Sequence, residues 1–256
     1  MFLNCISLET LSISNASNIN TSNVTNLCGI FAKCKKLKEL PDIISNWTTS
    51  NVTNMSYMFA NCENLENIPN LSNWETLNVN DMSGIFLNCK KIKSLSDISN
   101  WKTDNVINMN EMFNGCCNLD SLPDISAWNT SKVISTSFMF NHCCKIKDMS
   151  VISSLDLSNV KDMSGMFAEC FYLEKIPKFS LVQNVINTSL MFLSCSKLKV
   201  PDENENFEFK FDISKITEMI YMFYDCKLIS KKEISKYFDI KDFKKDKTGI
   251  FSGCKK

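Results

Sequence analysis

The stretch N-V-T-N-M-S-Y-M-F-A-N-C-E-N-L, residues Asn51–Leu65, recurs in altered copies along the whole chain. Its constant core is Met or Ile, then Phe, two variable residues and Cys, and the core occurs at spacings of 25 to 31 residues. The phenylalanines are Phe2, Phe31, Phe59, Phe86, Phe113, Phe140, Phe167, Phe192, Phe223 and Phe251. A period of this length predicts a solenoid, in which each unit buries its apolar side chains against its neighbours.

The apolar residues of one unit fall into two segments. Val52, Met55, Phe59 and Cys62 are spaced by three or four residues, which predicts a short helix or a 3₁₀ turn. The residue before the first Met is Asn, Asp or Ser in seven units, and these residues are the preferred helix N-caps. The segment L-x-x-L-P-D-I that follows is short and contains Pro, so we predict a strand there. The fold class is therefore predicted to be an α/β repeat solenoid.

Ten of the thirteen cysteines lie three residues after a repeat phenylalanine, and we call them the ladder cysteines. Because each stands at one repeating position beside an apolar residue, we predict buried free thiols rather than disulfides. Cys28, Cys117 and Cys144 lie off this ladder. Cys117 and Cys144 follow ladder cysteines in adjacent units, so they are the first candidates for a disulfide.

No constellation in the sequence indicates catalysis. The single histidine, His142, precedes Cys143 and Cys144, and a His-Cys-Cys triplet is one sequence that could hold zinc. Cys143 belongs to the ladder, however, so we interpret His142 as an ordinary turn residue and expect no metal and no cofactor. Phosphate-binding loops and the common hydrolase motifs are absent from the sequence, so we expect no catalytic residues and no enzymatic activity.

The charge and hydropathy of the chain narrow the classes of partner. Lys balances Asp plus Glu at 28 each, and there is no arginine, which argues against a nucleic-acid-binding protein. No segment reaches the roughly 18 apolar residues of a membrane span, and the first residues lack the basic start of a signal peptide. The localisation therefore stays open between the cell surface and the cytoplasm.

The repeated motif of Asn51–Leu65, recurring in register, resembles the BspA-type leucine-rich repeat of surface proteins in bacteria, mycoplasmas and protists. This resemblance implies a leucine-rich-repeat-like right-handed superhelix. Its parallel strand ladder would lie on one side, with short helices or 3₁₀ turns opposite. The resemblance also implies a role in adhesion or protein binding at the cell surface or outside the cell, and it supplies no catalytic residues.

The repeat pattern is regular up to Cys226 and weaker after it. We therefore predict a solenoid of about nine units over residues 1–226, and a degenerate last unit or C-terminal cap over residues 227–256. Both ends of the sequence fall inside a unit, so the N-terminal end is a candidate for self-association.

The residue four positions after each ladder cysteine carries a charge whose sign alternates through eight units. This charged row consists of Glu9, Lys38, Glu66, Lys93, Asp120, Lys147, Glu174 and Lys199. In a parallel ladder these residues would stack about 4.8 Å apart, where opposite charges attract by roughly 0.2–1 kcal/mol per pair. We predict that the row projects into solvent from the strand face, holds the units in register and forms an interaction surface.

The sequence as a whole predicts a non-enzymatic repeat module that binds a protein or a glycan in adhesion or surface interaction. The neutral, mixed-sign row suits such a partner better than a polyanion. The alternative is an intracellular scaffold or effector-type leucine-rich-repeat protein with reduced cysteines.

Overall fold

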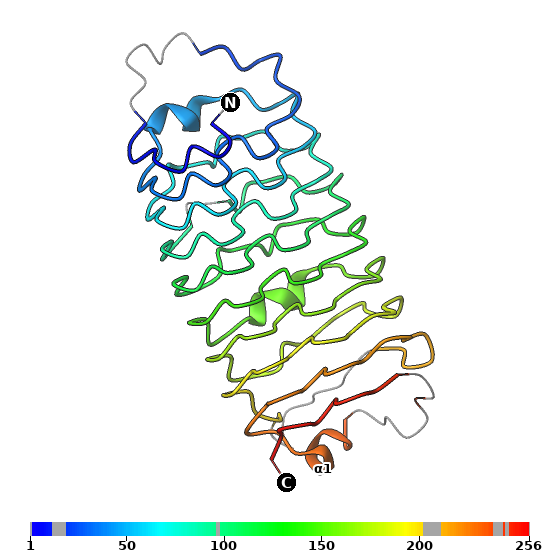
Figure 1. Cartoon of the computed structure of the whole chain (residues 1–256). Coiled ribbons are helices and arrows are strands. Elements are labelled where there is room, and N and C mark those ends of the chain that lie inside the picture. The colour runs from blue at the N-terminus through cyan, green and yellow to red at the C-terminus, as the bar shows by residue number, and fades with distance from the viewer. Residues whose placement is uncertain are drawn as a thin grey trace.

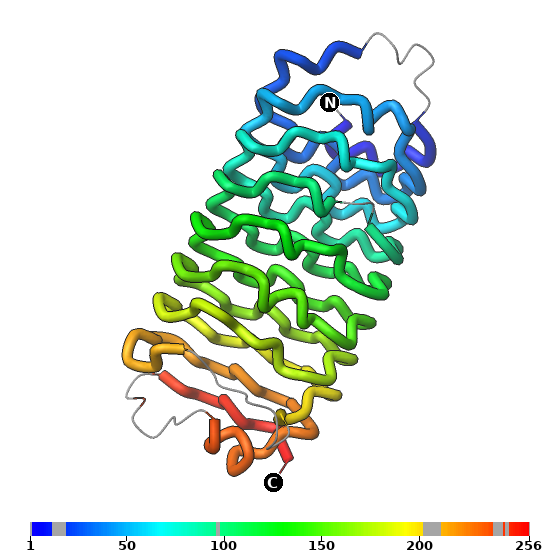
Figure 2. Tube along the Cα trace, turned by 180° about the vertical axis from the view of Figure 1, so that it is seen from behind, coloured from blue at the N-terminus to red at the C-terminus, as the bar shows by residue number. Residues whose placement is uncertain are grey.

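The computed structural model describes residues 2–11, 19–95, 98–201, 211–237, 243 and 246–255. The chain winds into a stack of coils, one coil per sequence repeat, from the N-terminal end at the top of Figure 1 to the C-terminal end at the bottom. Each coil runs out along one side of the stack and returns along the other, as the reverse view in Figure 2 also shows. The repeat solenoid expected from the sequence is therefore the observed architecture.

Successive coils are joined by parallel β-bridges at the residue that precedes the first Met of each unit. The bridged residues are Asn26, Asn54, Asp81, Asn108, Ser135, Asp162, Asn187, Glu218 and Asp246, each paired with the next. We call the part of each coil before the ladder cysteine the outgoing arm and the part after it the returning arm. Further parallel bridges occur on the returning arm, including Glu39 with Asn67 and Lys175 with Lys199. All of these bridges are isolated, so within the described ranges the expected strand ladder consists of single paired residues instead of extended strands.

Two alternatives were expected for Val52–Cys62, a short helix or a 3₁₀ turn, and the helix is not formed. Single turns closed by i to i+3 hydrogen bonds are present instead, such as Ala60 N–H to the Tyr57 carbonyl at 3.0 Å. The segment is a run of turns in which Tyr57 and Asn61 have positive φ angles of 55° and 60°. Alternate residues from Met55 to Asn61 donate their N–H groups to carbonyls of the next coil, at 2.6–3.0 Å. The stacked neighbour supplies the acceptors that a helix would supply internally, so the chain turns every few residues and still satisfies its backbone. The same turns produce the three- and four-residue spacing of the apolar side chains.

The residues predicted to be helix N-caps do cap a backbone amide, although the amide belongs to a turn. Asn54 Oδ1 accepts the Ser56 N–H at 2.8 Å, and Asp81 accepts from Ser83 at 2.9 Å. A side-chain oxygen that satisfies the amide two residues ahead is an Asx turn, which uses the same residue types as an N-cap. The capping role of these side chains was therefore predicted correctly, but they cap turns and not helices.

Among the described residues there are three short helical elements, and all lie outside the predicted segment. The 3₁₀ helices η2, Asp42–Asn46, and η3, Ser150–Ser154, occupy the end of the returning arm. The α-helix α1 spans Lys231–Ile234 near the C-terminal end of the stack (Figure 1). Ser230 and Glu233 form a reciprocal capping box at its start, which satisfies two amides of this one-turn helix.

The core is a column of stacked phenylalanines, one from each coil. Neighbouring rings lie 5.3–5.9 Å apart between centroids and within 17° of parallel, from Phe2 to Phe251. Trp47, Trp74 and Trp101 form a second column at 6.4 Å spacing. A fully buried aromatic side chain contributes about 1.5–3 kcal/mol, so the columns supply much of the attraction between coils.

The ladder cysteines have a specific partner, which is the carbonyl oxygen of the preceding coil's phenylalanine. Nine thiols, from Cys34 to Cys254, lie 2.9–3.3 Å from that oxygen. The Phe59 oxygen, for example, accepts the Cys62 N–H at 3.1 Å and the Cys89 thiol at 3.2 Å, so both of its lone pairs are used. The eight ladder cysteines from Cys34 to Cys226 are fully buried, which confirms their predicted burial.

We expect Cys89→Ala to lower the free energy of unfolding by about 1–2 kcal/mol, because it leaves a small cavity and one unused lone pair. Cys89→Asp should cost more than about 3 kcal/mol, since it buries a charge without a partner. Urea denaturation followed by circular dichroism measures both, and Cys28→Ala at an exposed thiol is the control. Equal costs for the two Cys89 variants would contradict the assigned burial.

Polar side chains of the repeat also bond between coils. Thr76 Oγ1 donates to the Lys102 carbonyl of the next coil at 3.0 Å, and Asn78 Nδ2 donates to the Ser50 carbonyl of the preceding coil at 2.7 Å. Equivalent bonds recur from Thr49 to Thr130 and from Asn51 to Asn184. The Thr and Asn of the T-S-N-V motif therefore recur because their side chains hydrogen-bond to the backbone of adjacent coils.

Three glycines stand where an aromatic ring of the preceding coil covers the backbone. Gly84 has a φ of +56°, and a Cβ atom there would lie 2.5 Å from the ring of Tyr57. Gly165 and Gly249 are covered in the same way. The positive φ and the lack of space both require glycine at these positions.

Gly84→Ala should therefore lower the free energy of unfolding by about 1–3 kcal/mol, because the added methyl group displaces the Tyr57 ring and strains the backbone. Glu111→Ala is the matched control, since Glu111 occupies the same position of the next coil with a φ of +56° and already carries a Cβ. Thermal and urea denaturation should show the loss only for Gly84→Ala. Equal losses would mean that the aromatic cover contributes nothing.

The C-terminal residues repeat the contacts of the other coils. Glu218 pairs with Asp246, and Phe223 stacks on Phe251 at 5.8 Å. Ser230 pairs with Lys255 on the returning arm. The boundary expected at residues 226 and 227 stays a prediction.

Candidate interaction face

The charged row lies on the returning arm of the coils, and all eight of its side chains are exposed. The backbone places its members in register: the Glu66 N–H donates to the Lys38 carbonyl at 2.9 Å, and the Asp120 N–H donates to the Lys93 carbonyl at 3.0 Å. Equivalent bonds join Glu174 to Lys147 and Lys199 to Glu174. The structure therefore brings the row together along one face of the solenoid.

The acids of the row do not pair with their direct neighbours in the row anywhere in the described part of the chain. Three of the four acids pair instead with the lysine two positions after the next ladder cysteine. The pairs are Glu9–Lys36 at 3.4 Å, Glu66–Lys91 at 3.7 Å and Asp120–Lys145 at 3.8 Å. These partners were missed in the sequence, although the recurring C-K-K and C-C-K tripeptides mark a lysine at this position. Such half-exposed pairs contribute about 0–1 kcal/mol each.

Glu63 pairs with two lysines, one from the coil on each side of it. Its carboxylate lies 2.9 Å from Lys90 Nζ and 2.9 Å from Lys35 Nζ, so it links three successive coils. Hydrogen bonds from Lys90 and then from Lys35 lower the pKa of this carboxyl. Lys90, Glu63 and Lys35 therefore form a charge network that is separate from the charged row.

We expect Glu63→Gln to lower the free energy of unfolding by about 0.5–1 kcal/mol at pH 7 and low salt, because two half-exposed ion pairs are lost. A lowered pKa means that the contribution is complete above the ordinary value of 4.5 and is lost as the pH falls through the folded-state pKa. The difference between wild type and variant should thus shrink in acid. Glu75→Gln, whose carboxylate has no ion pair among the described residues, should show no such dependence.

Three hollows follow one another along the row. The first has a volume of about 580 Å³ and is lined by Asp120, Ser121, Lys145, Ile146, Lys147, Asp148 and Tyr172. The second, of about 570 Å³, is lined by Glu66, Asn67, Lys91, Lys93, Ser94 and Asn118. The third, of about 370 Å³, adjoins the first at Asp148 and extends past η3 to Lys178. Four members of the charged row thus line hollows.

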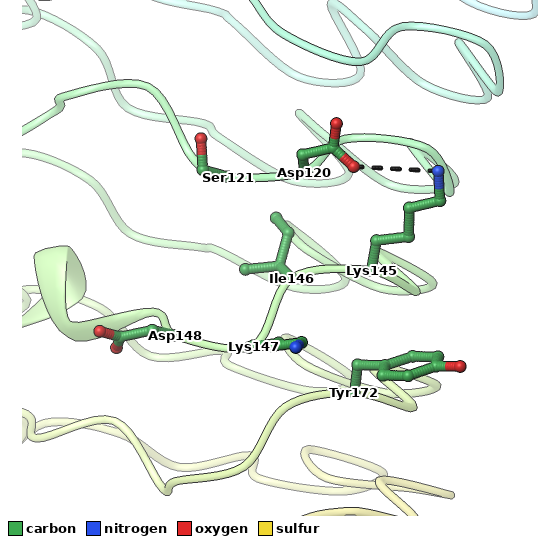
Figure 3. A pocket seen from close by; sticks show the side chains of 7 residues that line it. All are labelled: Asp120, Ser121, Lys145, Ile146, Lys147, Asp148 and Tyr172. Carbon is green, nitrogen blue, oxygen red and sulfur yellow. Dashed lines mark ion pairs between the residues drawn. The ribbon is translucent and has the colours of Figure 1, made fainter.

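The first hollow combines an ion pair with an aromatic ring. Figure 3 shows Asp120 and Lys145 paired at one end, with Tyr172 on the next coil at the other end and Lys147 between them. The Tyr172 side chain is half exposed. A tyrosine ring beside paired charges offers both apolar contact area and hydrogen bonding, the combination that protein and glycan recognition sites use. Tyr172 was not identified from the sequence.

A second group of side chains lies at the corner of the coils, beside the ladder cysteines. Ligand atoms of Cys117, His142 and Cys144 all lie within 4.8 Å of one another. His142 Nδ1 is 2.7 Å from Glu169 Oε2. His142 has a φ of +57°, so it is a turn residue as predicted, but its side chain is not isolated from other ligand-type groups. The expectation of no metal site did not foresee this group, because its members come from two coils.

No helix within the described residues is long and apolar enough to cross a membrane.

A family model described as "Mycoplasma protein of unknown function" (DUF285) matches residues 1–95, 64–171 and 146–256, which together span the chain. The chain belongs to the DUF285 family. This confirms the resemblance to mycoplasma surface-protein repeats that the motif indicated. No curated protein matches this DUF285 chain in sequence.

Solved structures of leucine-rich repeat proteins resemble this DUF285 member at low identity. A leucine-rich repeat protein from Bacteroides ovatus is 19% identical with a TM-score of 0.40, and the match covers 85% of this chain. The chain spans 58% of that protein's length. A leucine-rich cell surface protein from Faecalibacterium prausnitzii is 15% identical, with 77% and 67% of the two chains covered and a TM-score of 0.30. A leucine-rich repeat protein from Eubacterium ventriosum is 15% identical, with 96% and 88% covered and a TM-score of 0.30.

Proposed function

We propose that this DUF285 chain is a non-enzymatic module that binds a protein or a glycan in adhesion or surface interaction. The observation that carries the proposal is the face formed by the charged row, where three hollows adjoin the row and Tyr172 is exposed. A long surface built from equivalent positions of stacked units is the kind of surface that solenoids use for binding.

The use of polar groups in the rest of the repeat supports a binding role. The threonines and asparagines of the T-S-N-V motif are committed to hydrogen bonds between coils. Three of the four acids of the charged row are held in exposed ion pairs with lysines. Exposed charged pairs of this kind are typical of the polar rim of recognition surfaces.

The charge of the face indicates the chemistry of the partner. Acids and lysines alternate along the row, and the chain has a formal net charge of zero. A polyanion such as DNA is bound through an excess of positive charge, which this face lacks. We therefore propose a partner with mixed polar and apolar groups, as folded proteins and glycans present.

Two finer features of the architecture belong to the same proposal. We propose that the superhelix is right-handed, as in the repeats that the motif resembles. We also propose that residues 227–256 act as a degenerate last unit that closes the stack. The capping box of α1 and the stacking of Phe251 on Phe223 support this closing role.

The proposal is tested by screening the intact chain on glycan and extracellular-protein arrays, and by measuring each hit with wild type and the double variant Lys147→Glu/Tyr172→Ala. We expect the double variant to lose at least about tenfold in affinity, because it removes an aromatic anchor and reverses a charge in the first hollow. Lys161→Glu, an exposed charge reversal on the outgoing arm, is the control and should bind within twofold of wild type. Loss of binding in the Lys161→Glu control alone would contradict the proposal, because it would place the binding site on the outgoing arm.

One observation favours the alternative of an intracellular scaffold or effector. The eight ladder cysteines from Cys34 to Cys226 are buried and donate their thiols to backbone carbonyls, and thiols persist most readily in a reducing compartment. A thiol count on the chain isolated from its native cells separates the two versions: thirteen free thiols favour the scaffold, and oxidised cysteines favour the exported module.

A further inference from the structure

The group formed by Cys117, His142 and Cys144 departs from the repeat at three positions. Cys117 and Cys144 occupy the position after the ladder cysteine in adjacent coils, where other units carry Glu63, Lys90 or Phe171. Parallel stacking places equivalent residues of adjacent coils about 4.8 Å apart, so the two thiols face each other across the coil boundary. Two residues before Cys144, the turn at His142 brings the imidazole to the same corner. This is the only group of metal-ligating side chains found among the described residues.

The ligand atoms are close to the arrangement that a tetrahedral metal requires. Zinc binds thiolate sulfur at about 2.3 Å and imidazole nitrogen at about 2.0–2.1 Å, which places the ligand atoms of one site roughly 3.6–3.8 Å apart. The three atoms here already lie within 4.8 Å of one another. Side-chain rotations that shorten these separations by at most about 1 Å would therefore complete the three-ligand set.

The surroundings of His142 resemble those of a metal-bound histidine. Glu169 Oε2 lies 2.7 Å from Nδ1, and the Glu169 carboxylate is not among the atoms that approach both thiols. A carboxylate that accepts the Nδ1 proton fixes the tautomer whose Nε2 lone pair points away from it. Phe171 packs edge-on against the imidazole at 5.8 Å and holds the ring at the corner. One side of the ring is thus engaged by the carboxylate, and Nε2 remains for a ligand.

We propose that Cys117, Cys144 and His142 Nε2 bind one zinc ion, with Glu169 as the residue that orients the histidine. Two thiolates balance the charge of Zn²⁺, and the neutral imidazole completes a set of soft and intermediate ligands that suits this metal. The fourth position remains for water or a group from a partner, because all three residues are only partly buried. The ion would cross-link two coils beside Lys145, which lines the first hollow.

The main competing outcome for this pair of cysteines is a disulfide. The two sulfur atoms lie within 4.8 Å of each other. A disulfide would bring them to about 2.05 Å and would remove both thiolate ligands, so the two outcomes exclude each other. Titration of the reduced chain with metal therefore distinguishes them.

The test uses the intact chain, reduced and freed of metal, and titrated with Co²⁺ as a spectroscopic probe for Zn²⁺. We expect one equivalent to produce a thiolate-to-cobalt charge-transfer band with tetrahedral d–d bands, and Zn²⁺ to abolish both. Cys144→Ser and His142→Asn should each weaken Co²⁺ binding by about 100-fold or more. Glu169→Gln should weaken it by about 10-fold, as loss of an orienting partner typically does.

Cys28→Ser is the matched control, since Cys28 is an exposed cysteine off the ladder and outside the group. Its spectrum and affinity should equal those of wild type, and circular dichroism of every variant verifies the fold. In addition, Zn²⁺ should raise the melting temperature of wild type and Cys28→Ser but leave that of Cys144→Ser unchanged. The proposal is overturned by any of three results: absence of the charge-transfer band in the folded, reduced chain, an unchanged band in Cys144→Ser, or equal loss in Cys28→Ser. A Cys117–Cys144 disulfide in a chain that binds no Co²⁺ after reduction would assign the pair to a covalent cross-link.

Discussion

Backbone amides that find their acceptors only in the next coil hold this solenoid together. Between Met55 and Asn61 every second N–H donates across the coil boundary, and the chain between those donors turns back on itself. The ladder thiols complete the arrangement, because each gives the preceding phenylalanine carbonyl its second hydrogen bond. An isolated unit would leave these groups unsatisfied and its phenylalanine exposed, so folding requires neighbours.

This dependence explains how the repeat divides its side chains. Residues that face a neighbouring coil are restricted to types that stack or bond there: Phe and Trp in columns, Cys on a carbonyl, and Thr and Asn on adjacent backbones. Residues that face solvent on the returning arm are not restricted in this way, and there the charged row, the hollows and Tyr172 are found. The residues that face neighbouring coils therefore determine the architecture. The solvent-facing residues of the returning arm form the proposed binding surface.

A regular stack also turns isolated departures from the consensus into local sites. A substitution in one unit lies beside the same position of the next unit, so two unusual residues a whole repeat apart become neighbours. Cys117 and Cys144 meet in this way, and the turn at His142 adds a third ligand-type group. Glu63 likewise connects Lys35 and Lys90 because all three occupy one position in successive coils.

The period, the buried column of Phe59 and its equivalents, and the burial of the ladder cysteines could all be predicted from the sequence, because each depends on a pattern that every unit repeats. The local conformation could not, since the apolar spacing of Met55, Met58 and Cys62 fits a helix and a run of turns equally well. Acceptors in the next coil decide in favour of turns.

The charged row was likewise visible in the sequence, whereas its ion-pair partners were not. The direction in which Lys36, Lys91 and Lys145 extend across the coil boundary is set by the stacked geometry. The same reason applies to Glu169 on His142, because a contact between side chains of different coils exists only once the coils are stacked.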